Sequence, residues 1–303
     1  MNWNTFTSQF LSNLSLMLAR SPRWLQQLLR KFLFLLAYYL LSYRKKVVDQ
    51  NLELAFPAWS AAKRKHTRKL FYQHLSETLL EINAIRNLSR EAYRQKIHYE
   101  NIEVLQNLLK EGKSVIIAYA HYGNWEYTTS LPLWIDEPVY AVYRTLSNPI
   151  ADRVIFETRS RFGAIPVPMQ HIYKELSMAQ AAGKNHVALF VADQSPPRSQ
   201  IKAWFPFLSQ PTAFFQGVER ISRKLGHAVV YLEMSKKPSG QYRGRFELIT
   251  DNPKTCLPNE ISLRYVRLLE ATIQKEPARW LWSHRRWKHK PDGSIILTSS
   301  AHD

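Results

Sequence analysis

Hydrophobic residues along the chain follow two alternating patterns, one with the spacing of an amphipathic helix and one with the continuous apolar run of a buried strand. The clearest helical pattern covers 66–85, where one face collects Leu70, Phe71, His74, Leu75, Thr78, Leu79 and Ile82. Further helices are predicted after Gly123 and at 101–112, 148–163, 171–183, 211–226 and 258–277. Several of these patterns end at a glycine, which is a typical carboxy-terminal stop of a helix.

Strand-like runs occupy the segments between these helices. They cover 114–120, 138–144, 186–194, 228–234 and 241–250, and the last is expected to pair antiparallel with the one before it. Strands that alternate with helices, without a Gly/Ser/Pro linker, predict an α/β fold with a mixed central sheet flanked by helices. We expect a single α/β domain over 51–303, preceded by a separate helical segment at 1–50.

The amino-terminal segment contains an unusual apolar stretch, 32–43, between the cations of 30–31 and 44–46. Its twelve residues are too few for a membrane-spanning helix, which needs roughly 20. We therefore expect a segment that lies in the membrane interface or is partly inserted, with its cations at anionic headgroups. A buried core helix is the alternative. The flanking cations predict that this end stays on the cytoplasmic side, and no secretory signal is indicated.

The charge of the chain indicates an anionic partner. There are 42 Lys and Arg residues against 24 Asp and Glu, a net charge of +18. Nucleic acid, a phospholipid surface, an anionic substrate and an acidic protein would all fit such a charge. The apolar segment favours the membrane among them. The single Cys256 excludes a disulfide framework and a cysteine-rich zinc site, and it fits a reducing compartment.

The stretch "SVIIAYAHYGNWE" brings His121 to the end of a predicted buried strand and Glu126 into the first turn of the helix that follows. In open α/β sheets, reactive side chains gather at the carboxyl ends of the strands. A carboxylate on one ring nitrogen of a histidine leaves the other nitrogen to accept a proton and stabilises the imidazolium that forms. The spacing therefore predicts a general base, His121, oriented by Glu126.

No nucleophile accompanies this pair, because the chain has no G-x-S-x-G elbow and Cys256 shows no sign of activation. The hydroxyl to be activated would then belong to the substrate. Arg159 and Asp193 are expected to supply a cation and a second strand-end carboxylate on the same side of the sheet. The alternative is structural: His121 as a hydrogen-bonded core histidine and Glu126 as an acid that complements a helix dipole. No metal site or nucleotide-binding glycine loop is indicated, and no cofactor is expected.

These residues occur in fragments that resemble the lysophospholipid acyltransferase superfamily, and within it the secondary acyltransferases of lipid A biosynthesis. The fragments, in chain order, are "NLELAFPAWS", "HYGNWE", "YRTLSNP", "RSRFG", "VADQSPP", "FFQGVERISRKLGHAVVY" and "PARWLWSHRRWK". "HYGNWE" matches the family's H-x4-acid signature. The resemblance implies transfer of a fatty acyl group from an acyl carrier protein thioester to a hydroxyl of a lipid A precursor, at the cytoplasmic face of the bacterial inner membrane.

The resemblance also implies roles for individual residues. His121 would deprotonate the acceptor hydroxyl and Glu126 would orient it. Arg159 would stabilise the thioester oxyanion or hold a substrate phosphate. Asp193 would order Arg159 or the active-site loop, unless it is a strand-end turn residue. Asn124 would donate a hydrogen bond towards the oxyanion, or cap a helix.

Two further groups of cations remain open in this interpretation. The chain departs from the family where other members carry an Arg-x-x-Lys-like run, so the second cation is Arg161 or Arg198. In the carboxy-terminal segment 278–290, tryptophans are interleaved with cations that include Arg285, Arg286 and Lys288. Because tryptophan favours membrane interfaces and cations suit phosphate, we expect this segment to contact headgroups, substrate phosphates or the carrier protein.

Two alternatives to this function were weighed. An acyltransferase could act on another membrane acceptor, such as an aminolipid or a glycolipid. A basic nucleic-acid-binding protein would also fit the net charge of +18 and the 13% aromatic content. The second alternative is disfavoured, because the sequence has no known nucleic-acid reader motif and its aromatic residues lie near apolar helical faces.

Overall fold

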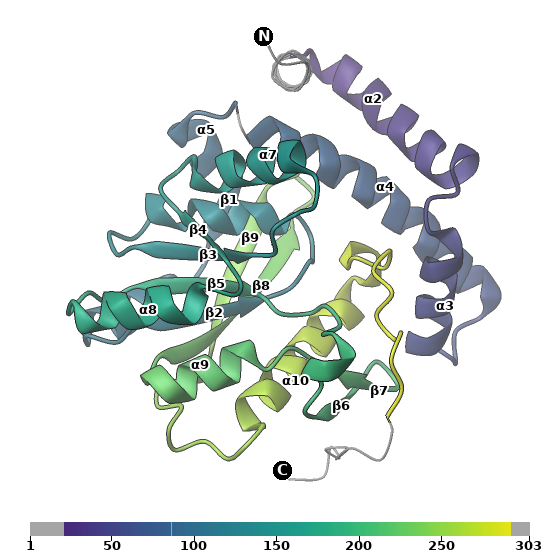
Figure 1. Cartoon of the computed structure of the whole chain (residues 1–303). Coiled ribbons are helices and arrows are strands. Elements are labelled where there is room, and N and C mark those ends of the chain that lie inside the picture. Colours follow the sequence, from purple (N-terminus) through teal and green to yellow (C-terminus); the bar gives the residue numbers. More distant parts are fainter. Residues whose placement is uncertain (1–20, 86, 292–303) are drawn as a thin grey trace.

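The computed structural model of the chain describes residues 21–85 and 87–291 (Figure 1). Within these residues, a seven-stranded sheet has the order β1-β9-β8-β2-β5-β3-β4, and β6 and β7 form a separate two-stranded sheet. The strands of the large sheet are β1 (Ile97–Tyr99), β2 (Val115–Tyr119), β3 (Val139–Tyr143), β4 (Ile165–Pro168), β5 (Val187–Val191), β8 (Ala228–Lys236) and β9 (Tyr242–Thr250).

The large sheet is mixed, as predicted. β8, β2, β5, β3 and β4 run parallel to one another. β9 is antiparallel to β8, and β1 pairs parallel to β9. The predicted antiparallel pairing of 241–250 with 228–234 is therefore confirmed.

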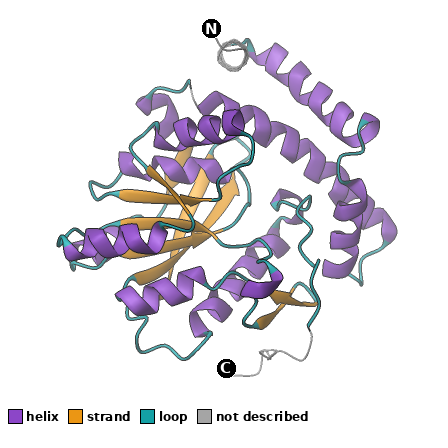
Figure 2. Cartoon of the chain, viewed as in Figure 1, coloured by secondary structure: helices purple, strands orange, loops and turns teal. Residues whose placement is uncertain are grey.

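Helices cover both faces of this sheet, as Figure 2 shows. They are α5 (Arg90–Arg94), α6 (Glu103–Lys110), α7 (Pro149–Ser160), α8 (Ile172–Ala181), α9 (Gly217–Leu225) and α10 (Glu260–Lys275). All the residues of β2 are buried, which is why that strand reads as an uninterrupted apolar run and not as an alternating one.

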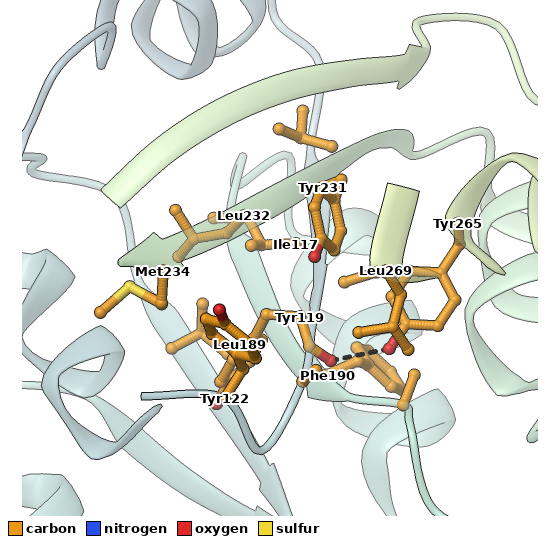
Figure 3. Packing of buried hydrophobic residues seen from close by; sticks show 14 of the residues in the cluster. Ile117, Tyr119, Tyr122, Leu189, Phe190, Tyr231, Leu232, Met234, Tyr265 and Leu269 are labelled. Carbon is orange, nitrogen blue, oxygen red and sulfur yellow. Dashed lines mark hydrogen bonds between the residues drawn. The ribbon is translucent and has the colours of Figure 1, made fainter. Parts of the chain in front are cut away.

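The core around β2 includes two tyrosines, Tyr231 and Tyr265, whose hydroxyl groups form hydrogen bonds (Figure 3). Tyr265 of α10 donates a hydrogen bond of 3.0 Å to the backbone carbonyl of Tyr119, and Tyr231 of β8 donates one of 2.8 Å to Thr272. Buried hydroxyl groups are costly unless they are paired. These bonds therefore fix α10 against the end of β2, immediately before His121.

Within the described residues, the chain begins with α2 (Arg23–Leu35), the π-helical turn η1 (Leu36–Leu40), α3 (Lys45–Ala55) and α4 (Ala61–Ile85), which come before α5 and the sheet. Figure 1 shows α2 along the outer side of α4, away from the sheet. α2 packs one face on α4 and exposes the other. The exposed large apolar side chains of α2, η1 and the following turn are Trp24, Leu28, Phe32, Leu35, Tyr39, Leu40, Leu41 and Tyr43.

This exposed stripe shows that α2 is an amphipathic surface helix, so the alternative of a helix enclosed in the core does not hold. Among the described residues, no helix combines the length and the hydropathy of a membrane span. The first twenty residues of the predicted 1–50 segment, and 292–303 at the other end, lie outside the described residues.

Two predicted helical faces or bounds differ from the structure. In α4, Leu70 and Leu79 are 39% and 53% exposed, so the buried stripe is narrower than predicted. The predicted helix 211–226 is confirmed only in its second half, as α9. Its first half forms β7 (Gln210–Ala213), which pairs with β6 (Trp204–Phe207).

The β6–β7 hairpin was missed because its turn lacks the usual residues. Leu208 and Ser209 both adopt positive φ, of 48° and 61°. Two-residue hairpin turns with this backbone normally contain Asn or Gly. Neither occurs at these positions, so the sequence carried no turn signal.

The helix predicted after Gly123 is a 3-10 helix, η2 (Trp125–Leu133). Three consecutive hydroxyl side chains, Thr128, Thr129 and Ser130, donate hydrogen bonds to the carbonyls three residues before them. Pro132 removes a backbone donor near the end of the turn. These features favour the tighter winding over an α-helix.

Candidate active site

The register between β2 and β5 brings His121 next to Asp193. Tyr119 pairs with Val191, so residues two positions beyond each strand end lie opposite one another. His121 and Asp193 occupy those positions. The Asp193 carboxylate accepts one hydrogen bond from the backbone N–H of His121, at 3.1 Å, and lies 2.7 Å from the ring nitrogen Nδ1.

This geometry determines what the imidazole can do. With Nδ1 facing a carboxylate, the neutral ring carries its proton on Nδ1 and keeps a lone pair on Nε2. The Nε2 atom lies 3.4 Å from the side-chain nitrogen of Gln194, and the ring packs edge-on against Trp125. The His121 side chain is 18% exposed, whereas Asp193 is 2% exposed. His121 is thus an accessible base with a buried partner.

The carboxy-terminal segment 278–290 completes the surroundings of Asp193. The Trp280 indole donates a hydrogen bond of 2.7 Å to the second carboxylate oxygen, Oδ2. Burial opposes ionisation of Asp193, but the charge of His121 and the hydrogen bonds from His121 and Trp280 outweigh it and lower the pKa of Asp193. Asp193 is therefore a carboxylate throughout the neutral range.

The predicted contact between Glu126 and His121 is wrong. Glu126 accepts hydrogen bonds from Arg159 at both oxygens, from Nη2 at 2.7 Å and from Nε at 3.0 Å, and one from the Trp125 indole at 3.0 Å. Both residues are buried. The physical reason is the 3-10 winding of η2 and the strand register, which give the histidine to Asp193 and the arginine to Glu126.

The buried Glu126–Arg159 pair is a bidentate ion pair of the strong kind. Burial raises the pKa of Glu126, but Arg159 outweighs this effect and the net pKa is lowered. The pKa of Arg159 is raised, because the charge of Glu126 outweighs the opposing effect of burial. Of the two predicted uses of Asp193, the ordering of Arg159 is wrong, since Arg159 is held by Glu126, whereas the hydrogen bond from the His121 backbone agrees with an ordering of the active-site loop. With two of its nitrogens on one carboxylate, Arg159 positions Glu126 and Trp125, which touches the His121 ring.

Asn124 acts as the helix cap that was one of its two predicted uses. Its side chain accepts a hydrogen bond from the backbone N–H of Glu126 at 3.3 Å. Its amide donates to Glu81 of α4 at 3.1 Å, and the residue is fully buried. The predicted hydrogen bond towards an oxyanion is disfavoured, because the amide nitrogen faces Glu81 and the side chain is fully buried.

Helix α4 holds the loop that carries His121 in place. Glu81 also accepts hydrogen bonds from Lys236 and from the Tyr242 hydroxyl. His74 lies 3.3 Å from the carbonyl of Gly123 and 3.2 Å from Arg279. Burial, with a smaller contribution from Arg279, lowers the pKa of His74 to about 3, so its ring is neutral. The sequence analysis placed His74 on the apolar face of this helix, but no pattern in the sequence indicated that these residues support the loop.

The two candidates for the second cation lie elsewhere on the surface. Arg161 donates a hydrogen bond to the carbonyl of Leu88 and stacks over the Phe162 ring, on the exposed side of the loop after α7. Arg198 begins η3 (Arg198–Gln200), an exposed turn in the segment after Asp193. Arg198 is the one that follows β5 and Asp193 in the chain, and its contact with substrate remains a prediction.

The carboxy-terminal segment is more buried than a contact with headgroups, substrate phosphates or the carrier protein would require. Trp280 and Trp282 are 3% and 0% exposed and belong to the core. Arg286 is buried over the Phe214 ring, 4.2 Å from its centroid, and donates to the carbonyl of Ala213. Burial lowers the pKa of Arg286 to about 10, and the charge of Asp193 offsets part of this effect. Contact of Arg286 with headgroups or carrier protein is therefore wrong.

Arg285 and Lys288 are exposed, and a role for them in substrate or membrane contact stays a prediction. In 21–85 and 87–291, no group of three or more His, Cys, Asp or Glu side chains is arranged to hold a metal ion. A very small cavity, of about 10 Å³, lies between α4 and the site, lined by Phe71, His74, Leu75, Thr78, Trp125, Arg279, Trp280 and Leu281. It is bounded by the same Trp125 and Trp280 that contact His121 and Asp193.

Comparison with known proteins gives one family. Residues 5–289 match the model of the bacterial lipid A biosynthesis acyltransferases. The chain is 23% identical over 257 residues to the lipid A biosynthesis palmitoleoyltransferase of Escherichia coli K12, covering 84% of this chain and 82% of that protein. It is 24% identical over 261 residues to the lauroyltransferase of the same organism, covering 82% and 81%.

A solved structure is also similar, that of the 1-acyl-sn-glycerophosphate acyltransferase PlsC from Thermotoga maritima. The TM-score is 0.37 at 14% sequence identity, over 84% of this chain and 97% of that one.

Proposed function

The chain belongs to the family of bacterial lipid A biosynthesis acyltransferases, and on this premise we propose that it transfers a fatty acyl group from an acyl carrier protein thioester to a hydroxyl of a lipid A precursor. The observation that supports the chemistry best is the His121–Asp193 pair, in which Nε2 keeps its lone pair at an accessible position. The enzyme class, an O-acyltransferase, follows from the family; the donor and the acceptor hydroxyl are the proposal.

In the proposed reaction His121 acts first as a base. Its Nε2 removes the proton from the acceptor hydroxyl while the oxygen attacks the thioester carbonyl, and a carbon–oxygen bond forms. Asp193 stabilises the imidazolium without taking the proton itself. The tetrahedral intermediate then collapses, the carbon–sulfur bond breaks, and the imidazolium returns its proton to the leaving thiolate. The products are the ester and the free thiol.

No enzyme nucleophile is needed for this sequence, and the position of Cys256 agrees with direct transfer. Cys256 contacts Thr250, which pairs with Val229 at the start of β8. Val229 lies beside Ile116 near the beginning of β2, so Cys256 is at the opposite end of the sheet from His121. The other contacts of the His121 ring, with Gln194 and Trp125, involve no hydroxyl or thiol.

The test is acyl transfer by the purified full chain. We expect a lipid A precursor to gain one acyl group from an acyl carrier protein thioester, detected by mass spectrometry of the lipid, with thioesters of several chain lengths compared. The matching coenzyme A thioesters identify the donor, and an aminolipid and a glycolipid serve as competing acceptors. Transfer from coenzyme A alone, or to a competing acceptor alone, would reject the proposed substrates.

We also propose that the exposed stripe of α2 lies in the interface of the cytoplasmic face of the bacterial inner membrane. Trp24, Leu28, Phe32, Leu35 and Tyr39 repeat at helical spacing on the face that no other element covers within the described residues. Such a helix buries its apolar face at the boundary of headgroups and acyl chains. The acceptor is a lipid, so this placement brings it within reach of the site.

Replacing Leu28 and Phe32 together with glutamate should reduce binding to anionic vesicles at least 10-fold. Each side chain contributes about 1.5 to 3 kcal/mol when buried, and a carboxylate is repelled by anionic headgroups. Because the two side chains are 53% and 59% exposed, thermal unfolding should not change. Co-sedimentation with vesicles of phosphatidylglycerol and phosphatidylethanolamine measures the effect.

Gln27→Glu is the matched control, since it adds a carboxylate to an exposed residue of the same helix. It should bind nearly as well as the unmodified protein. Equal binding by the Leu28→Glu/Phe32→Glu variant and the unmodified chain would reject the interfacial placement of α2.

A further inference from the structure

Asn51 of α3 joins the amino-terminal helices to the carboxy-terminal segment. It is 3% exposed, and its amide group donates two hydrogen bonds, of 2.8 Å to the carbonyl of Trp282 and 2.7 Å to that of His284. Arg44 donates a third, of 3.1 Å, to the carbonyl of Ser283 between them. Figure 1 shows this yellow segment running beside α3. The carbonyls of 282–284 thus accept hydrogen bonds from Arg44 and Asn51, which lie far away in the sequence.

The same few residues of the carboxy-terminal segment hold the catalytic pair. The Trp280 indole donates a hydrogen bond to Asp193, and the backbone N–H of Leu281 donates to the carbonyl of His121 at 3.1 Å. The His284 ring accepts a hydrogen bond of 3.1 Å from the backbone N–H of Ser195, two residues after Asp193. Burial lowers the pKa of His284 to about 4, so the ring is neutral and able to accept this bond. Residues 280–284 therefore contact both strand-end loops.

The contacts on the two sides of 280–284 differ in what they do. On one side, Asn51 and Arg44 bind backbone carbonyls, which fixes the path of the segment. On the other side, Trp280 and His284 use their side chains to fix Asp193 and the loop after it. Two buried hydrogen bonds to one amide are costly to lose, because the carbonyls would be left without partners.

We propose that Asn51 is a positioning residue of the acyl-transfer reaction, which sets the place of Asp193 through Trp280. This inference rests on the proposed function. A displacement of about 1 Å in a catalytic group can reduce a rate on the order of 100-fold, even when its cause lies away from the reacting atoms. Asn51 lies on α3, the helix that follows α2 and η1, so it links the amino-terminal helices to the segment that contacts His121 and Asp193.

A double-mutant cycle on kcat tests the proposal. The variants are Asn51→Ala, Trp280→Phe and both together. We expect each single variant to lower kcat by about 10- to 100-fold, with the KM for either substrate within about two-fold of the unmodified enzyme. Because both substitutions act on Asp193 along one route, the kcat of the double variant should be close to that of the slower single variant. The two losses in kcat should not multiply.

Asn101→Ala is the matched control. Asn101 also makes two backbone hydrogen bonds, to the N–H and the carbonyl of Phe246, but at the far edge of the sheet. Asn101→Ala should lower the melting temperature about as much as Asn51→Ala does, and it should leave kcat unchanged. The Asn101→Ala/Trp280→Phe double variant should have the same kcat as Trp280→Phe alone. If Asn51→Ala does not fold at the assay temperature, Asn51→Ser is used in its place, because serine keeps one short polar group.

A second readout does not depend on turnover. The rate at which diethyl pyrocarbonate modifies His121, followed by mass spectrometry of the peptide, should rise several-fold in Asn51→Ala and in Trp280→Phe, with no further rise in the double variant. If the enzyme without substitutions transfers no acyl group, the proposed function is rejected. The reactivity of His121 would still decide whether Asn51 positions the site. Multiplicative losses in kcat, or unchanged His121 reactivity in folded Asn51→Ala protein, would overturn the proposal.

Discussion

His121→Ala is expected to lower kcat for acyl transfer by 10² to 10⁴-fold, which is about 3 to 5 kcal/mol of barrier. The accessible Nε2 is the base in the proposed reaction, and alanine leaves the acceptor hydroxyl without one. Asp193→Asn should cost nearly as much, because an amide at this position no longer stabilises the imidazolium and can hold the ring in the wrong tautomer. Steady-state rates with saturating donor and lipid measure both effects.

The effects of the two substitutions on kcat should not be additive in free energy. His121 and Asp193 act as one unit, so the double variant is expected to be about as slow as His121→Ala alone. All three proteins should unfold cooperatively near the temperature of the unmodified chain. Folded Asp193→Asn protein with a rate close to normal would contradict the assignment of Asp193 as the partner of His121.

Glu126→Ala is expected to destabilise the fold as well as reduce turnover. It would leave the Arg159 guanidinium buried without its carboxylate, which typically costs about 3 to 5 kcal/mol of unfolding free energy. At about 2 to 4 °C per kcal/mol for a domain of this size, the melting temperature should fall by roughly 10 °C. Thermal unfolding followed by circular dichroism measures the change.

Two controls separate the ion pair from a direct catalytic role. Replacing Glu126 and Arg159 together with methionine removes both charges, and should recover most of the stability that Glu126→Ala loses. Glu157→Ala removes the partner of Arg153 in the exposed pair of the same helix and should change the melting temperature little. Glu126→Ala protein with a normal melting temperature and no turnover would instead support a catalytic carboxylate at this position.

The sequence by itself determined the layer architecture and the position of His121. Continuous apolar runs predicted β2, β5 and β8 because strands covered on both faces have no polar side. His121 was located correctly at the carboxyl end of β2, since a polar residue that directly follows such a run must leave the sheet at its edge. Family resemblance rested on fragments in a fixed order, and the family match over residues 5–289 confirmed it.

The partner of His121 was decided by the tertiary structure. Sequence spacing favoured Glu126, which is local, whereas Asp193 lies 72 residues away and becomes adjacent only through the β2–β5 register. Local spacing contains no information about which strands are neighbours. The same holds for the carboxy-terminal segment, where tryptophans and arginines look alike in sequence whether they face lipid or core.

Burial separated those two possibilities. Trp280 became the hydrogen-bond donor to Asp193, and Arg286 was enclosed by Phe207 and Phe214, because 278–290 packs between the sheet and α3. Conversely, the apolar amino-terminal segment fitted either a membrane interface or a core helix, and α2 exposes its apolar stripe because α4 contacts only one of its faces. The sequence showed which residues are available to the site. Which of them pair depends on the strand order and on the packing of the two terminal segments against each other.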